Sequence, residues 1–376
     1  MKLYLSFLWN LHRPLLPSRP FLDKHMGEIL GYRKQWSKKV VEFCKKFIDI
    51  CINIDLPFVL NISGILIEQL ENENPNLLKD LKKLFKKKKF EILGTSYFNA
   101  LLPFLPEEDV KEQINFHLEK INDFKPKGFF FPELVYDPWL IDSIIENKFE
   151  WILASDEWLK IDLMNYKEEI LFKPCYFWGI KGNYIKTVLV NKNLSSLLQN
   201  FSEENKEKIL SELERILNLY GNENPIIIFL INTKDINIEI LNSYELFFKE
   251  IKEINNFKPI LISDYLEKFP IEAKEENIFY ISPHSLEGDC SLKIWSRLDE
   301  QKILFKLIDY ARDEINLSKG LVMNKAGENL LERAKRELFL AESADWFDYK
   351  KNAYKFLLGR GHALNAFRLA KAIQKL

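Results

Sequence analysis

Short apolar runs alternate with longer amphipathic stretches along residues 1–270. Runs of Phe, Ile, Leu and Val that are bounded by polar residues or proline are typical of buried strands. The stretches between them carry apolar residues every three or four positions, which is the spacing of an amphipathic helix. The runs that predict strands are 3–9, 58–62, 90–93, 129–131, 151–154, 186–190, 225–231, 259–262 and 278–281.

Helix-start signals agree with this alternation. Ser63 and Ser202 are of the residue type that accepts the first backbone N–H groups of a helix, and Pro106 precedes two glutamates that suit a first helical turn. The longer predicted helices cover residues 34–53, 75–88, 106–121, 202–219 and 237–255. Strands that alternate with helices form right-handed βαβ units with parallel strands. About seven such units favour a closed or nearly closed α/β barrel over an open sheet.

The pattern changes after Ser282. Residues 298–315, 330–345 and 353–375 all have helical spacing and are rich in Leu, Ala, Lys and Glu. No tandem repeat or low-complexity linker separates them from the first part, so we expect them to pack on it. The sequence therefore predicts a barrel over residues 1–270 and a helical region over residues 271–376.

Polar residues follow several of the predicted strands directly. They are His12, Asn99, Glu133, Asp156, Glu157, Asn232 and Asp235. The carboxyl ends of parallel barrel strands form one rim, where catalytic residues and ligands collect. Two carboxylates on such a rim could carry out glycosidic acid–base chemistry. The aromatic residues that would offer flat faces to sugar rings there are Trp9, Tyr97, Tyr136, Trp139 and Trp158.

Each of these residues also has an ordinary structural interpretation. Glu133 follows a proline at the end of a strand, where an acidic residue often stabilises the start of a helix. Asp156 and Glu157 suit a helix or turn cap, and a histidine such as His12 is often a hydrogen-bonded structural residue. No HxxxH or HxH spacing supports a metal site at His12, so we expect no metal.

The charge balance excludes some partners. Lys and Arg number 54 against 55 Asp and Glu, so the formal net charge is -1 and nothing calls for a nucleic acid. No apolar run is long enough to span a membrane, and residues 1–9 lack the features of a signal peptide. The four cysteines have no CxxC pairing, so we expect free thiols in a reducing cytoplasm.

Four segments resemble motifs of glycoside hydrolase family 57. They read NLHRP at 10–14, EILGTSY at 91–97, FPELVY at 131–136 and LFLAESADW at 338–346. Their order and spacing extend the resemblance over most of the chain. It implies an incomplete (β/α)7 barrel with a C-terminal helical part. It also implies an amylase, 4-α-glucanotransferase, branching enzyme or galactosidase that acts on α-glucans with retention and needs neither organic cofactor nor metal.

The resemblance also implies roles for individual residues. Glu133 falls on the nucleophile of the third motif, and His12 falls on a histidine that lines the donor sugar site. Asp345 and Trp346 fall on the segment that closes the site from the helical side. The other residues expected to contact the glucan are Arg13, Tyr97, Asn99, Tyr136, Trp139 and Asn232.

Several positions depart from the family pattern. Asn10 stands where the family has a histidine, Arg13 where it has a glutamine, and Asn99 where some members have a histidine. Asn232 stands where the family has its general acid–base aspartate. Asparagine cannot exchange a proton at neutral pH, and general acid–base catalysis contributes about 10²–10⁴-fold. Asp235 could take over this role if the loop is remodelled.

Two main hypotheses follow. The first is a retaining glucan hydrolase or transferase with Glu133 as nucleophile and Asp235 as acid–base. The second is a glucan-binding or regulatory homologue that has lost turnover, in which Glu133 could persist as an ion-pair partner of Arg13. A related barrel chemistry such as sugar deacetylation is less favoured, because the metal-ligand spacing is missing.

Overall fold

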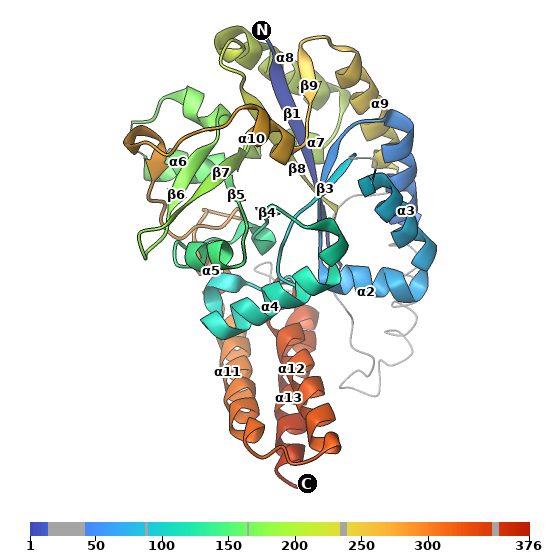
Figure 1. Cartoon of the computed structure of the whole chain (residues 1–376), viewed down its shortest axis with the longest axis vertical. Helices are drawn as coiled ribbons and strands as arrows, with labels where there is room; N and C mark the ends of the chain where they lie inside the picture. The colour runs from blue at the N-terminus through green and yellow to red at the C-terminus, as the bar shows by residue number, and fades with distance from the viewer. Residues whose placement is uncertain (14–41, 87–88, 164, 234–238, 348–352) are drawn as a thin grey trace.

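Seven parallel strands form a nearly closed barrel (Figure 1). The computed structural model describes residues 1–376 apart from 14–41, 87–88, 164, 234–238 and 348–352. The barrel strands are β1 (Leu3–Leu11), β2 (Phe58–Ile62), β3 (Phe90–Ile92), β4 (Gly128–Phe129), β5 (Trp151–Ser155), β7 (Tyr184–Val190) and β8 (Ile226–Asn232). β1 lies between β2 and β8, β2 pairs with β3, and β5 lies between β4 and β7. The predicted barrel fold is confirmed.

Two seams of the barrel are narrow. β7 and β8 meet at a single residue pair, and β3 reaches β4 through Gly94, which forms a bridge with Phe129. The Gly94 N–H donates to the Gly128 carbonyl at 2.9 Å. A Cβ atom at Gly94 would lie 2.2 Å from the Phe149 ring. Only glycine fits between this ring and the strand, so Gly94 allows the barrel to close.

Three further strands extend the sheet outside the barrel. β6 (Cys175–Trp178) runs antiparallel to β7, β10 (Ile278–Phe279) pairs with β6, and β9 (Phe257–Pro259) pairs with the beginning of β1. The sequence analysis did not predict β6. It also extended a strand from 259 to 262, whereas Ile262 begins helix α10 (Ile262–Lys268). The Ile260 N–H still donates to the Leu5 carbonyl at 2.9 Å, and the chain then turns into α10.

Helices connect the strands and cover the outside of the barrel (Figure 1). Residues 42–54 are helical. The helices that follow are α2 (Gly64–Glu73), α3 (Pro75–Lys86), α4 (Glu107–Lys120), α5 (Leu140–Glu146), α6 (Asp156–Asp162), α7 (Lys192–Gln199), α8 (Glu203–Tyr220) and α9 (Ile240–Glu253). Ser63 Oγ accepts the Leu66 N–H at 3.4 Å and Ser202 Oγ accepts the Asn205 N–H at 3.1 Å. Both predicted helix caps are therefore confirmed.

The direction of side chains along β1 decides which residues reach the barrel interior. All nine residues of β1 are buried. The Trp9 ring packs on the helical layer, with its centroid 4.6 Å from that of Phe47 and 5.7 Å from that of Tyr244. Successive side chains alternate across a strand, so Asn10 points to the other face, into the barrel. Trp9 is therefore a core residue and offers no surface to a sugar.

Three helices form the C-terminal region, namely α11 (Asp299–Lys319), α12 (Lys325–Ala341) and α13 (Ala353–Ile373). They extend away from the barrel at the end opposite the N-terminus (Figure 1). Their apolar residues share a core with Tyr97, Phe98, Leu101 and Val135 from the loops after β3 and β4. The helical region thus packs on the barrel, as expected; the division at residue 270 stays a prediction. None of the described helices is long and apolar enough to cross a membrane.

Candidate functional site

Three asparagines lie side by side where β2, β1 and β8 end. In the register of the sheet, Asn10 is paired with Asn61 on one side and with Asn232 on the other. Asn61 Nδ2 donates to Asn10 Oδ1 at 2.7 Å, and Asn10 Nδ2 donates to Asn232 Oδ1 at 2.8 Å. We call Asn61, Asn10 and Asn232 the amide row. It is neutral along its whole length, because a side-chain amide neither gains nor loses a proton at neutral pH.

Gln199 of α7 holds the end of the amide row. Its Oε1 accepts the Asn232 N–H at 2.9 Å, and its Nε2 donates to the Asn232 carbonyl at 2.8 Å. Both contacts involve the backbone, so the Asn232 side chain stays directed at Asn10. Asn232, the last residue of β8, is therefore a fixed hydrogen-bonding group that does not supply a proton.

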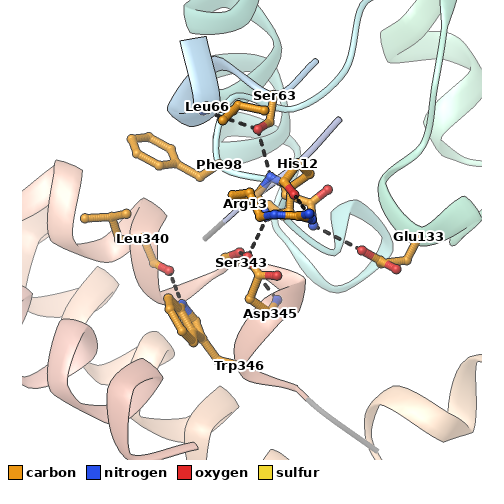
Figure 2. Close-up of polar contacts among 12 residues, drawn as sticks. His12, Arg13, Ser63, Leu66, Phe98, Glu133, Leu340, Ser343, Asp345 and Trp346 are labelled. Carbon is orange, nitrogen blue, oxygen red and sulfur yellow. Dashed lines mark hydrogen bonds and ion pairs between the residues drawn. The ribbon is translucent and has the colours of Figure 1, made fainter. Parts of the chain in front are cut away.

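His12 joins the end of β1 to the helical region (Figure 2). Its Nε2 lies 2.6 Å from Asp345 Oδ2 and its Nδ1 lies 2.7 Å from Ser63 Oγ. Ser63 Oγ already accepts the Leu66 N–H, so its own hydroxyl proton is available to Nδ1. The Nε2 proton then points at Asp345, which also accepts from Ser343 Oγ at 2.8 Å. His12 and Asp345 are 1% and 7% exposed, so this contact is shielded from water.

Glu133 lies across the site from the helical region (Figure 2). Asn99 Nδ2 donates to Glu133 Oε1 at 3.2 Å. Asn99 and Glu133 have φ values of 58° and 56°, and Leu134 follows with 46°. Such left-handed backbone costs about 1–3 kcal/mol at each residue that is not glycine, and it concentrates at functional sites. The two strained residues thus present an amide and a carboxylate to each other.

Arg13 ties the end of β1 to the end of β8. Its Nη2 donates to the Thr233 carbonyl at 2.5 Å, and its Nη1 donates to its neighbour His12 at 3.1 Å. Thr233 Oγ1 donates in turn to the Asn10 carbonyl at 2.9 Å. These contacts bring Arg13 beside the amide row, and a contact between Arg13 and a glucan stays a prediction.

The predicted aromatic site residues lie deeper than expected. Tyr97 donates its hydroxyl to Glu68 at 3.0 Å and is 9% exposed. Tyr136 is fully buried and stacks on Trp158, with 5.4 Å between ring centroids. Trp346 donates from Nε1 to the Leu340 carbonyl inside the helical region. These three side chains lie in the core behind the site. Among the predicted aromatic residues, only Trp139 is half-buried, so it is the one with surface left to contact a sugar.

Two carboxylate predictions have different outcomes. Asp235 lies outside the described residues. Asp156 begins α6, where it accepts the Lys192 N–H at 3.0 Å and pairs with Lys160 at 2.9 Å. Glu157 also pairs with Lys160, at 2.8 Å. Ser155, and neither Asp156 nor Glu157, caps α6, because its Oγ accepts the Glu157 N–H at 3.3 Å; the two acidic residues lie in the first turn of the helix.

Sequence reasoning missed three residues that support the site. Asn61 is a polar residue inside the apolar run at 58–62, and this departure from the pattern was a usable signal. Ser63 was assigned only as a helix cap, although it also contacts His12. Gln199 carried no local signal, because its role arises from contacts with the backbone of β8.

Two buried titratable groups of the barrel do not belong to the site. Burial lowers the pKa of His117 to about 4, against the opposing effect of its hydrogen bond with the Ile62 carbonyl. His117 Nδ1 accepts the Thr95 N–H at 3.3 Å, so the neutral ring connects the ends of β2 and β3. Burial raises the pKa of Glu91 to about 7, although hydrogen bonds from Ser263 oppose the shift. In the described parts of the chain, no three His, Cys, Asp or Glu side chains gather in a way that could hold a metal ion.

Comparison with known proteins agrees with this arrangement of motifs. The family model of glycosyl hydrolase family 57 matches residues 4–290. The chain belongs to glycosyl hydrolase family 57. An α-amylase from Pyrococcus abyssi is 25% identical to this family-57 chain over 275 residues, which are 70% of this chain and 39% of the relative. Alpha-amylase 1 from Dictyoglomus thermophilum is 26% identical over 171 residues, which are 41% of this chain and 24% of the relative.

In each of these two relatives, the matched part is less than half of the relative's full length. Among solved structures, a family-57 branching enzyme from Thermococcus kodakaraensis, crystallised with glucose, has a TM-score of 0.78. The superposition covers 99% of this chain and 90% of that enzyme, at 14% sequence identity. This likeness concerns the fold. It shows that the barrel and the helical region together are an arrangement found in the family.

Proposed function

We propose that this protein binds α-glucan chains at the carboxyl end of the barrel, where Glu133 attacks the anomeric carbon of a donor sugar with retention of configuration. We further propose that it turns over natural glucans only slowly. The observation that carries this proposal is the amide row, because it holds Asn232, which falls on the acid–base position of the family motif, as a neutral hydrogen-bonded amide. The α-amylases among the relatives support an α-glucan as the ligand.

The geometry at Glu133 supports a role as nucleophile. The carboxylate is half-buried, sits on strained backbone and accepts a hydrogen bond from Asn99. The amide row is neutral, and two hydrogen bonds join its three side chains in series. A donor sugar bound there would meet hydrogen-bonding amides on one side and the Glu133 carboxylate on the other.

The absence of a general acid determines which glycosyl substrates can react. A retaining glycosidase attacks with one carboxylate while a second group protonates the departing oxygen. Without that proton, cleavage of an ordinary glycosidic bond slows by about 10²–10⁴-fold. A glycosyl fluoride needs no proton. The Glu133 Oε–C1 bond forms as the C1–F bond breaks, and fluoride leaves with the electron pair.

The test compares two donors on the same protein. Incubated with α-maltosyl fluoride, the wild-type protein should release fluoride and gain the mass of one maltosyl group, whereas maltodextrin should be cleaved slowly. Glu133→Gln should abolish the mass gain, because the amide is a poor nucleophile. Equal fluoride release by wild type and Glu133→Gln would refute the role of Glu133.

Asp235 provides the matched control for the missing acid. If Asp235 served as acid–base, maltodextrin would be cleaved rapidly and Asp235→Asn would abolish that activity. This result would replace the present proposal with a competent hydrolase or transferase. We expect instead that the wild-type protein cleaves maltodextrin slowly and that Asp235→Asn does not lower this slow rate further.

A further inference from the structure

A buried ionic cluster connects α4 of the barrel with the helical region. Arg312 donates from Nε to Asp109 at 2.5 Å and from Nη2 to Glu342 Oε1 at 3.0 Å. The Glu342 side chain is fully buried, and its other oxygen accepts from Gln113 Nε2 at 3.1 Å. We call Arg312, Asp109, Glu342 and Gln113 the ionic cluster. These hydrogen bonds do not involve Glu133.

The ionic cluster forms hydrogen bonds with the loop after β3. Gln113 Oε1 accepts the Phe98 N–H at 3.1 Å. The Glu342 carbonyl accepts the Leu101 N–H at 3.4 Å. Residues 98 and 101 flank Asn99, so the cluster holds the loop on both sides of the residue that contacts Glu133.

The segment after Glu342 completes this hold. The Ala344 N–H donates to the Asn99 carbonyl at 2.9 Å, and Ala100 pairs with Ser343 in a short antiparallel bridge. Asn99 has left-handed backbone, with φ of 58°. Such a conformation persists only where the surroundings impose it, and here these surroundings are the loop's own turn together with residues 342–344.

We propose that Arg312, Glu342 and Gln113 are positioning residues that hold residues 98–101 against residues 342–344 and thereby aim the Asn99 amide at Glu133. This inference rests on the proposed function of Glu133 as nucleophile. An attacking group that is displaced by about 1 Å can lose about 10²-fold in rate. The helical region therefore acts on the reaction through the loop, although the ionic cluster lies away from the reacting atoms.

A second ion pair across the same interface provides a matched control. Lys335 of α12 pairs with Glu112 of α4 at 2.8 Å. Like the ionic cluster, this pair joins α4 to the helical region, but both of its hydrogen bonds are with Glu112 and neither involves residues 98–101. A purely structural role would make the two ion pairs equivalent for the reaction, whereas a positioning role would not.

The experiment measures glycosylation of Glu133 by α-maltosyl fluoride over a range of donor concentrations. Intact mass and fluoride release give a maximal rate constant and a half-saturating concentration. We expect Gln113→Met and Arg312→Met to lower the maximal rate constant by about ten- to a hundred-fold, with an unchanged half-saturating concentration. Lys335→Met should retain both wild-type values.

A conservative pair guards against loss of folding. Glu342→Gln keeps oxygen and amide groups that can bond Arg312 and Gln113, so it should retain most of the wild-type rate. Glu342→Ala should lose it. Circular dichroism on each variant gives the folded fraction, by which the rates are normalised.

The outcomes separate this inference from the proposed function. If the wild-type protein is not glycosylated at Glu133, the proposed function fails and the inference fails with it. If the wild type is glycosylated and Gln113→Met reacts at the same maximal rate constant, the inference alone is refuted. A rate loss shared equally by Lys335→Met would also refute it, because the effect would then come from the interface as a whole.

Discussion

Replacing Glu91 with glutamine should stabilise the protein at alkaline pH and have a much smaller effect at acid pH. The Glu91 carboxyl is buried inside the barrel, where it accepts hydrogen bonds from the Ser263 backbone N–H at 3.2 Å and from the Ser263 hydroxyl. Trp151 Nε1 donates to the same hydroxyl at 3.2 Å. Glu91 is 8% exposed, so little water reaches its charged form.

The magnitude follows from the pKa of Glu91. Burial raises this pKa from 4.5 to about 7, and Asp264 adds to the shift. The folded protein therefore holds the Glu91 proton more tightly than the unfolded chain. Stability from this group is fully present below the unfolded pKa and is lost as the pH rises through about 7. Each pKa unit corresponds to about 1.4 kcal/mol, so the loss amounts to about 3 kcal/mol at alkaline pH.

The assay is urea unfolding of wild type and Glu91→Gln at about pH 5 and about pH 8. The difference in unfolding free energy between the two proteins should change by about 2–3 kcal/mol between these pH values, in favour of the variant at the higher pH. A loss of hydrogen bonds in the variant that is the same at both pH values cancels when the two differences in unfolding free energy are subtracted. The exposed Glu276→Gln is the control and should show no such change. A constant difference at both pH values would refute the burial argument.

Three further predictions concern other positions. Asn232→Asp keeps an oxygen that can accept the Asn10 Nδ2–H and adds a proton-exchanging group, so maltodextrin turnover should rise by about 10²-fold or more, as measured by reducing-end release; no increase would contradict the role assigned to Asn232. Burial lowers the pKa of His117 from 6.5 to about 4, so its contribution is fully present above the unfolded pKa and is lost as the pH falls toward 4. Relative to His117→Gln, the wild type should lose about 3 kcal/mol of unfolding free energy across that window, and parallel pH profiles of the two proteins would exclude this. A Cβ at Gly128 would lie 2.2 Å from the Trp151 ring, so Gly128→Ala should lower the unfolding free energy by about 1–3 kcal/mol in urea titrations, and an unchanged midpoint would show that the ring can move aside.

The sequence by itself determined the order of strands and helices. Most of the predicted strands and both predicted helix caps occur where the sequence placed them. Apolar spacing and cap residues act over a few neighbouring positions, so they can be recognised without the tertiary structure. The four motifs, in their order along the chain, were also sufficient to indicate family 57, and the comparison confirms the family over residues 4–290. β6 was not predicted because it is a short strand that runs antiparallel to β7, outside the strand–helix alternation of the barrel.

Only the tertiary structure decided which residues meet. The amide row joins Asn10 to Asn232, which is 222 residues away, and His12 meets Asp345 across 333 residues. Trp9 packs against the outer helices, whereas its neighbour Asn10 faces the barrel interior. Register and facing are set by the packing of whole sheets, because a shift of one residue would reverse every side chain of a strand. A local sequence pattern contains no information on that choice, and so the partners of Glu133, Asn232 and His12 emerge only when the barrel closes and the helical region packs on it.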